Sequence, residues 1–178
     1  MEVSIRPIEV TDITDEFVSW HQNADGHLDY YTGSRRSFSR ADLVSWIEDS
    51  EQRRTFFYLI LIGNREPVGT IKIGPIDDKN KTSDLVCLIG NRNYVGRGLA
   101  SRAIVEGNRE AFERHDVRRL QGGMYESNVA SIKAYCRADW VIEGRMKGYY
   151  WIDGEAIDRV CVACFNPKYF DRRAIDEN

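Results

Sequence analysis

The sequence predicts a single α+β domain with a mixed, mostly antiparallel sheet flanked by helices. Residues 56–62 and 67–76 are apolar runs separated by a short turn, which is typical of neighbouring antiparallel strands. Residues 99–114 instead repeat apolar or small side chains at the spacing of one buried helical face. At 178 residues, 42% of them hydrophobic, the chain fits one domain with a full core, and no linker divides residues 1–178.

The first half of the chain is expected to form a strand, two helices and a hairpin. Residues 4–7 are a short strand, and residues 11–21 have the pattern of an amphipathic helix. Ser39 is a good cap for a helix over 40–50. Residues 56–62 are apolar on both faces, as in a central strand, and turn into the strand that follows.

The second half is expected to be organised around a glycine-bearing turn between a strand, 84–89, and the helix 99–114. Ser127 or Asn128 can cap a second helix. The remaining predicted elements are a strand at 119–125, a helix at 128–138, and a terminal hairpin of 141–150 and 157–165 around Asp153-Gly154.

The turn itself suggests a phosphate site. A strand that feeds a helix through glycines leaves backbone N–H groups unpaired, with the positive end of the helix dipole behind them. Gly96 and Gly98 allow close approach because neither has a Cβ, and Arg97 adds a positive charge. The pattern is neither a Walker A loop nor a dinucleotide fingerprint. Taken alone, it also fits a tight strand-to-helix connection without a ligand.

Two ordered motifs resemble the GNAT superfamily of N-acetyltransferases. Residues 93–98 resemble its acetyl-CoA loop, with Asn93 where the family has Gln or Arg. Further on, Asn128 is followed seven residues later by Tyr135, as in the family, although Asp139-Trp140 replaces the usual Gly-Phe pair. Residues 68–76 resemble a subgroup rich in ribosomal-protein and amino-sugar acetyltransferases. The resemblance implies a splayed GNAT sheet and an acetyl-CoA-dependent N-acetyltransferase.

The resemblance also implies roles for individual residues. Tyr135 would protonate the departing thiolate, and a backbone N–H near Cys87 or Leu88 would stabilise the oxyanion. Asp84 and Glu126 are the candidates for the base that deprotonates the amine, unless water relayed along carbonyls does so. The residues expected to hold acetyl-CoA, the co-substrate, are Leu88, Ile89, Val95, Gly96, Arg97, Gly98, Leu99, Ala100, Ser101 and Asn128.

The acceptor is expected to be a primary amine that attacks the thioester directly. An amino sugar, free or nucleotide-linked, is favoured, because aromatic and arginine side chains suit stacking and phosphate pairing. A protein N-terminus of the ribosomal-protein type and a non-catalytic CoA-binding module stay open as alternatives. The candidate acceptor-binding residues are Trp20, His21, Tyr30, Tyr31, Arg35, Arg36, Tyr149 and Trp151.

Composition argues against several other classes of protein. A net charge of −3 and a pI near 5.7 argue against a general nucleic-acid or membrane binder. The sequence has no apolar run of about 18 residues, so a cytoplasmic protein is expected. Cys161 and Cys164 would lie on opposite faces of a strand, so no metal site is expected. Exposed aromatic side chains in the terminal hairpin could support a homodimer.

Overall fold

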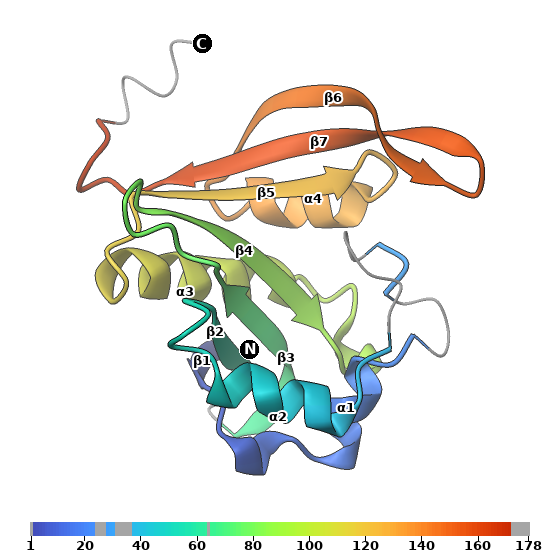
Figure 1. Ribbon diagram of the computed structural model, residues 1–178, viewed down its shortest axis with the longest axis vertical. Helices are drawn as coiled ribbons and strands as arrows, with labels where there is room; N and C mark the ends of the chain where they lie inside the picture. Colours follow the sequence, from blue (N-terminus) through green and yellow to red (C-terminus); the bar gives the residue numbers. More distant parts are fainter. Residues whose placement is uncertain (1, 24–27, 31–36, 64, 172–178) are drawn as a thin grey trace.

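The computed structural model describes residues 2–23, 28–30, 37–63 and 65–171, which form one seven-stranded sheet with helices on both faces (Figure 1). The strands are β1 (Val3–Pro7), β2 (Phe56–Ile62), β3 (Glu66–Ile73), β4 (Thr82–Ile89), β5 (Arg119–Tyr125), β6 (Val141–Ile152) and β7 (Glu155–Phe165). Their order is β1-β2-β3-β4-β5-β7-β6. Only the β4–β5 pair is parallel within these residues. The α+β class and the mostly antiparallel sheet are therefore confirmed.

The helices follow the predicted order, with one error near the N-terminus. The predicted helix over 11–21 is a short 3₁₀ turn, Val10–Asp12, followed by α1 (Asp15–Trp20). The break lies at Thr14, whose extended backbone and side-chain oxygen, accepting from the Phe17 N–H at 3.2 Å, make it an N-cap. The other helices are α2 (Arg40–Glu48), which Ser39 caps as predicted, α3 (Leu99–Glu113) and α4 (Val129–Cys136).

Strand β2 separates two hydrophobic cores, which explains why it is apolar on both faces. Tyr58 and Ile60 belong to the core beneath α3, whereas Leu59 and Leu61 pack with α1 and α2. Because side chains alternate along a strand, a central strand with a helix layer on each face needs apolar residues at every position. Figure 1 shows these layers, with α1 and α2 on the opposite side of the sheet from α3.

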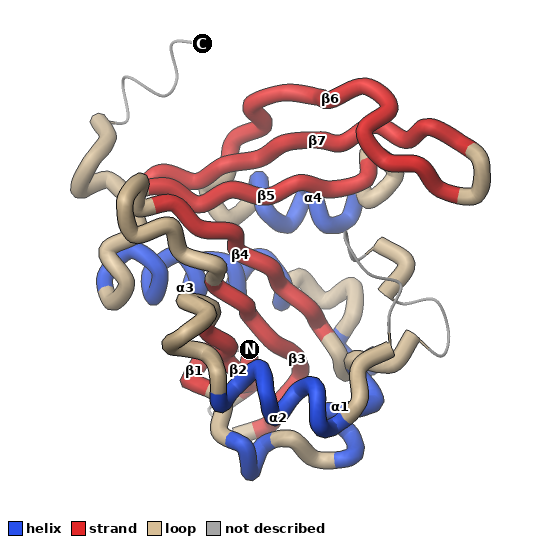
Figure 2. Tube along the Cα trace, in the orientation of Figure 1, coloured by secondary structure: helices blue, strands red, loops and turns tan. Residues whose placement is uncertain are grey.

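The sheet divides at its one parallel junction. β4 and β5 pair only at their first residues, where Thr82–Asp84 lie beside Arg119–Gln121. Beyond Asp84 the strands diverge, so the β1–β4 half and the β5–β7–β6 half open apart (Figure 2). The gap lies at the carboxyl end of β4, where the chain enters the glycine-bearing turn.

Strand β6 forms one edge of the sheet, with β1 at the other, and is mostly exposed. Its large exposed apolar side chains are Ile142, Met146, Tyr149 and Trp151. The homodimer expected from these aromatics stays a prediction. Among the described helices, none combines the length and the apolar character needed to cross a membrane.

Candidate functional site

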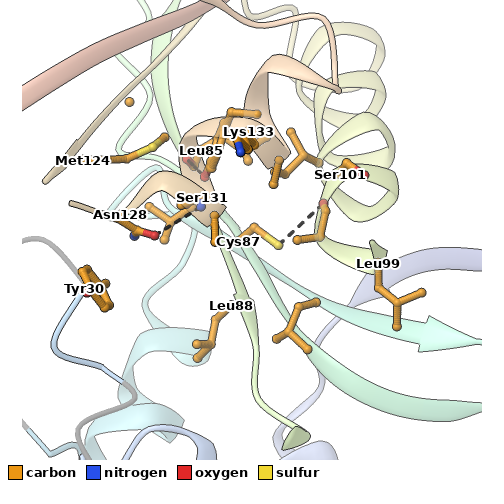
Figure 3. Close-up of a pocket in the computed structure, with 18 of the residues that line it drawn as sticks. Tyr30, Leu85, Cys87, Leu88, Leu99, Ser101, Met124, Asn128, Ser131 and Lys133 are labelled. Carbon is orange, nitrogen blue, oxygen red and sulfur yellow. Dashed lines mark hydrogen bonds between the residues drawn. The ribbon is translucent and has the colours of Figure 1, made fainter. Parts of the chain in front are cut away.

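A cleft of about 1210 Å³ lies at the opening between β4 and β5. Figure 3 shows how side chains from β4, α3, α4 and the segment around Tyr30 surround it. Most of the residues predicted to hold acetyl-CoA line this cleft: Leu88, Ile89, Val95, Gly96, Gly98, Leu99, Ala100, Ser101 and Asn128. The two motifs that lie far apart in the sequence are thus brought together.

The glycine-bearing turn presents N–H groups that have no partner within the described residues, but the N–H of Val95, one of the residues expected to hold acetyl-CoA, is not among them. The N–H of Val95 donates to the Arg92 carbonyl at 3.2 Å, inside a 3₁₀ turn over Arg92–Tyr94. Gly96 and Gly98 then take left-handed backbone angles, with φ of 78° and 73°. Gly98 is the N-cap of α3, so the first N–H groups of the helix have no partner within it.

The positive charge near this turn comes from different residues than expected. The Arg97 guanidinium lies 5.5 Å from the centre of the Tyr94 ring, and Arg97 does not contribute to the described cleft wall. Arg92, Lys133 and Arg137 line the cleft instead. A sequence signal existed for the last two, because residues four apart on a helix share a face.

The backbone of β4 faces the gap at alternate residues. The Asp84 carbonyl accepts from the Gly74 N–H on the β3 side, whereas the Leu85 carbonyl accepts the Tyr135 hydroxyl at 2.9 Å. By the alternation of an antiparallel strand, the N–H and C=O groups of Cys87 and Ile89 also face the gap, and those of Leu88 face β3. Leu88 therefore lines the cleft with its side chain.

Tyr135 is held firmly at the edge of the gap. It is buried on α4, lines the cleft and packs edge-on against Trp140, with ring centres 4.8 Å apart. The Trp140 Nε1–H donates to the Asn108 side-chain oxygen of α3 at 3.0 Å. The Asn108 amide in turn donates to the Ala138 carbonyl at 3.0 Å, which fixes the end of α4 against α3.

These contacts explain how Asp139-Trp140 can replace the family's Gly-Phe pair. Asp139 takes the left-handed backbone conformation, φ 64°, that a glycine would adopt most easily. Trp140 then supplies the aromatic ring that packs on Tyr135, and its backbone N–H donates to the Tyr135 carbonyl at 3.2 Å. Asp139 and Trp140 thus hold Tyr135 at the end of α4 in this chain.

Asn128 and Ser101 each use part of their hydrogen-bonding capacity within the protein. The Asn128 side-chain oxygen accepts from the Ser131 N–H at 3.2 Å and caps α4, as the sequence predicts (Figure 3). Its amide nitrogen has no partner within the described part of the chain. The Ser101 hydroxyl donates to the Gly98 carbonyl at 3.0 Å, so only its lone pairs are open to the cleft.

The structure separates the two candidate bases. Asp84 lines the cleft, and its backbone pairing places its side chain on the sheet face opposite Leu85 and α3. Glu126 forms an ion pair with Arg145 at 2.5 Å and is absent from the described cleft wall. Lys72, which sequence reasoning missed, lies beside Asp84, and burial lowers its pKa against the opposing effect of the Asp84 charge.

Cys87 has a side chain that can act as a nucleophile, but its environment keeps the thiol protonated. Its thiol lies in the cleft, and its Sγ–H is directed to the Ala100 carbonyl at 4.0 Å. Burial raises the pKa of the Cys87 thiol to about 12. At neutral pH the group is therefore a neutral thiol rather than a thiolate.

The predicted acceptor residues divide into three groups. Trp20 is 4% exposed and packs against Gly90, where a Cβ would lie 2.2 Å from the ring, so it is a core residue. His21 is also buried, and its Nδ1 donates to the Phe17 carbonyl at 3.1 Å. Neither lines the cleft. Their predicted role in acceptor binding is not supported by this placement, because α1, which ends at Trp20 with His21 as its C-cap, packs inward on β2.

Two of the predicted aromatic residues do line the cleft. Tyr30 and Tyr149 contribute to its wall, whereas Trp151 is 75% exposed and stands outside it. Tyr31, Arg35 and Arg36 lie outside the described residues. Tyr150 and Arg159 were not predicted, yet both line the cleft beside Tyr149.

A bulge in β6 sets the direction of Tyr149. The register between β6 and β7 shifts between Met146 and Tyr150, and Gly148 has φ 57°. The buried carboxylate of Asp158 accepts from the Gly148 N–H and from Lys147 Nζ, each at 2.9 Å. These hydrogen bonds lower the Asp158 pKa and hold the bulge in place.

Comparison with known proteins settles the family. The acetyltransferase (GNAT) domain family matches residues 2–141, which is most of the chain. The chain belongs to the GNAT family. Among the described residues, no group of three or more His, Cys, Asp or Glu side chains is placed to bind a metal ion.

The individual proteins to which the chain is similar share low sequence identity with it. An uncharacterized N-acetyltransferase, p20, of Bacillus licheniformis is 27% identical over 119 residues, or 66% of each chain, so the match spans slightly under two thirds of that relative. The fold is similar to spermidine N-acetyltransferase of Vibrio cholerae in complex with CoA and spermine (TM-score 0.81, 15% identity, 95% and 98% of the two chains). It is also similar to ribosomal-protein-S5-alanine acetyltransferase of Vibrio fischeri (TM-score 0.78, 17% identity, 96% and 97%).

Proposed function

We propose that this chain is an acetyl-CoA-dependent N-acetyltransferase that acetylates a primary amine, with an amino sugar, free or nucleotide-linked, as the acceptor. The observation that carries the proposal is the position of the Tyr135 hydroxyl at the edge of the β4–β5 gap, bonded to the Leu85 carbonyl at 2.9 Å. The unpaired N–H groups after Val95 lie in the same cleft. The V. cholerae neighbour that binds CoA supports the same co-substrate.

The residues of the cleft suit the parts of acetyl-CoA, which supplies an activated acetyl thioester. The N–H groups of Gly96 to Gly98 can donate to phosphate oxygens, and Arg92, Lys133 and Arg137 can balance phosphate charge. Cys87 and Ile89 can pair their backbone groups with the amides of the pantetheine arm, as a neighbouring strand would. The free amide nitrogen of Asn128 can add one further donor.

Acetyl transfer then needs an acid, a base and an oxyanion donor. Tyr135 can give its proton to the departing thiolate. The backbone N–H of Cys87 faces the gap and can stabilise the oxyanion. Of the two candidate bases, Asp84 fits better because Glu126 is held by Arg145 outside the described cleft wall. Water relayed along carbonyls remains the alternative to a side-chain base.

Direct attack of the amine is favoured over an acetyl-cysteine intermediate. Cys87 is the one cysteine among the described cleft residues, and its raised pKa keeps it protonated. The described cleft wall therefore offers no thiolate that could accept the acetyl group. Replacement of Cys87 by alanine is expected to leave the turnover rate within about threefold.

A protein N-terminus is the second candidate acceptor, and the similarity to ribosomal-protein-S5-alanine acetyltransferase supports it. The test is thiol release from acetyl-CoA with amino sugars, a UDP-linked amino sugar, spermidine and short peptides with a free N-terminus. Turnover confined to the sugars supports the favoured acceptor, and turnover confined to peptides supports the second. CoA binding without release from any amine contradicts catalysis and leaves a CoA-binding module.

A further inference from the structure

The arginine of β7 that faces the cleft has no anionic partner among the residues that the structure describes. Arg159 lines the cleft and is half-buried, and its Nε has no hydrogen-bond partner within the described residues. No ion pair joins its guanidinium to any carboxylate in that part of the chain. A half-buried cation without a partner costs folding free energy, so such a group is typical of a site that binds an anion.

Contacts from neighbouring strands position the Arg159 guanidinium. The guanidinium lies against Gly123 of β5, where a Cβ would come within 1.9 Å of Arg159 Nε. The Tyr149 ring covers it, with 4.9 Å between the guanidinium carbon and the ring centre. The β6 bulge that Asp158 fixes sets the position of that ring. Three elements thus hold a cation in one orientation.

The Arg159 side chain lies on the same sheet face as Asp84, the candidate base. Asp84 is directly opposite Gln121 in the β4–β5 pair, and Gly123 follows two residues later on β5, so their side-chain positions share one face. Tyr135 lies on the other side of the gap with α4. Arg159 is therefore on the same sheet face as Asp84, opposite the face on which α4, the helix that carries Lys133, packs.

The charges of the cleft disfavour a polycationic acceptor. Asp84 is the single carboxylate among the described residues of the wall. Its cationic residues are Lys72, Arg92, Lys133, Arg137 and Arg159. A polyamine would bring a second positive charge toward Arg159 and Lys72 with one carboxylate to balance it, and like charges at close range repel.

We propose that the acceptor carries an oxyanion close to its amine, a phosphate or a carboxylate, and that Arg159 binds this group. The inference rests on the proposed function, because it describes the acceptor of that reaction. Arginine suits the role, since its planar fork donates two parallel hydrogen bonds to either anion. Bound in this way, the acceptor is oriented with its amine toward the gap and Asp84.

Matched pairs of acceptors test the proposal. We would compare kcat/KM for glucosamine 6-phosphate with glucosamine, for alanine with alaninamide, and for spermidine. The anionic member of at least one pair is expected to react at least about tenfold better than its neutral partner. The pair that shows the difference identifies phosphate or carboxylate. Equal use of both members of each pair, or a preference for spermidine, would overturn the inference while leaving the N-acetyltransferase intact.

Variants then assign the preference to Arg159. Arg159→Gln is expected to abolish the anion preference by raising KM, with the affinity for CoA unchanged, and Arg159→Lys to retain part of it. Gly123→Ala, which displaces the guanidinium without removing its charge, is expected to act like Arg159→Gln. Arg109→Gln is the control, because Arg109 is exposed on α3, paired with Glu106 and outside the described cleft wall. A preference that survives Arg159→Gln overturns the assignment.

A binding measurement separates this inference from the proposed function. Titration of the CoA-loaded protein with the same compounds needs no turnover. Tighter binding of the anionic member that is lost in Arg159→Gln supports the inference even if no amine is acetylated. Equal binding of the anionic and neutral members contradicts it, whatever the outcome for catalysis.

Discussion

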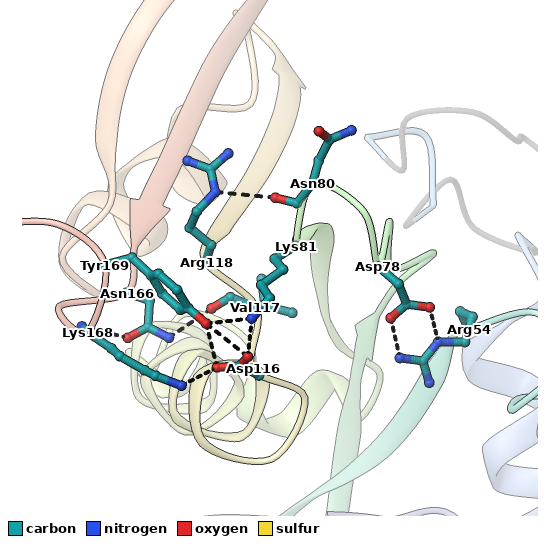
Figure 4. Close-up of polar contacts among 10 residues, drawn as sticks. All are labelled: Arg54, Asp78, Asn80, Lys81, Asp116, Val117, Arg118, Asn166, Lys168 and Tyr169. Carbon is teal, nitrogen blue, oxygen red and sulfur yellow. Dashed lines mark hydrogen bonds and ion pairs between the residues drawn. The ribbon is translucent and has the colours of Figure 1, made fainter.

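The two ends of the β4–β5 junction contrast in how their polar groups are satisfied. At the closed end, the strands pair, and Asp116 accepts hydrogen bonds from Lys81, Lys168 and Tyr169 (Figure 4). Nearby, the Arg118 Nε–H donates to the Asn80 carbonyl at 3.2 Å. The protein itself supplies the partners at this end.

At the open end, a few residues further along the same strands, several polar groups have no hydrogen-bond partner among the described residues. The backbone groups of Cys87 and Ile89 face the gap, and the N–H groups after Val95 and the Nε of Arg159 have no partner within the described chain. Unsatisfied polar groups cost free energy unless a ligand or water satisfies them. The contrast indicates that the closed end provides stability and the open end provides binding, and the following variants test that division.

The largest expected effect comes from Tyr135→Phe. Loss of the proton donor should lower kcat by roughly 100-fold or more, the usual contribution of a general acid, with the affinity for CoA nearly unchanged. Thiol release and calorimetric titration with CoA measure the two quantities. Tyr58→Phe is the control, since this buried tyrosine bonds His115 outside the described cleft wall. Near-normal kcat in Tyr135→Phe would assign the proton transfer to another group.

The next effect concerns the glycine-bearing turn. Gly98→Ala should weaken CoA binding by about tenfold, because a left-handed φ costs an alanine about 1–2 kcal/mol. Gly63→Ala is a matched control: Gly63 has φ 56°, and a Cβ meets nothing within 4 Å at either glycine. Both variants should melt at lower temperature, but only Gly98→Ala should bind CoA less tightly. Equal CoA affinity in the two variants would remove the turn from the binding site.

The same contrast shows what the sequence could predict. The bounds of β2 and β5 were predicted correctly, and for β2 the reason is that it is an apolar run closed by turn residues. The helix over 11–21 was wrong because Thr14 can either continue a helix or cap one, and packing of Phe17 on β2 decides between them. Local pattern defines elements, whereas tertiary contacts define their ends.

Site residues divide in the same way. Gly98, Asn128 and Tyr135, which the structure places in one cleft, could be singled out because backbone conformation, helix capping and motif spacing are visible in the sequence. Arg159 was not found because its importance depends on Gly123 lying on the neighbouring strand. Trp20 was nominated because aromatic side chains suit stacking on an acceptor, but an aromatic residue can equally fill the core, and here Trp20 packs on Gly90.

At the closed end, Asp116→Asn should reduce stability without affecting CoA binding. Hydrogen bonds from Lys168, Lys81 and Tyr169 hold the pKa of Asp116 well below its usual value. A lowered carboxyl pKa contributes stability above the unfolded value near 4, and that contribution is lost as the pH falls toward the folded value. The melting temperature of the variant should therefore lie a few degrees below wild type at pH 7, and the difference should shrink below pH 4. Circular dichroism across pH 2.5–7 measures it, and a constant difference would contradict the linkage.

The smallest effect is expected at Lys72→Met, at the boundary between the two ends. Burial lowers the pKa of Lys72, so between the folded and unfolded pKa values the folded state binds fewer protons than the unfolded state. The destabilisation is full below the folded pKa and disappears as the pH rises through the unfolded value near 10.4. Methionine keeps the length of the side chain and removes the charge, so the melting temperature should rise by about 1–3 °C at pH 7 and converge with wild type near pH 10. Lys79→Met, on an exposed turn, makes the same change in net charge without the burial. If Lys72→Met instead melts at a lower temperature than wild type and Lys79→Met, attraction to Asp84 outweighs the cost of burial. Lys72 would then resemble Lys81 at the closed end, whose charge is paired within the protein.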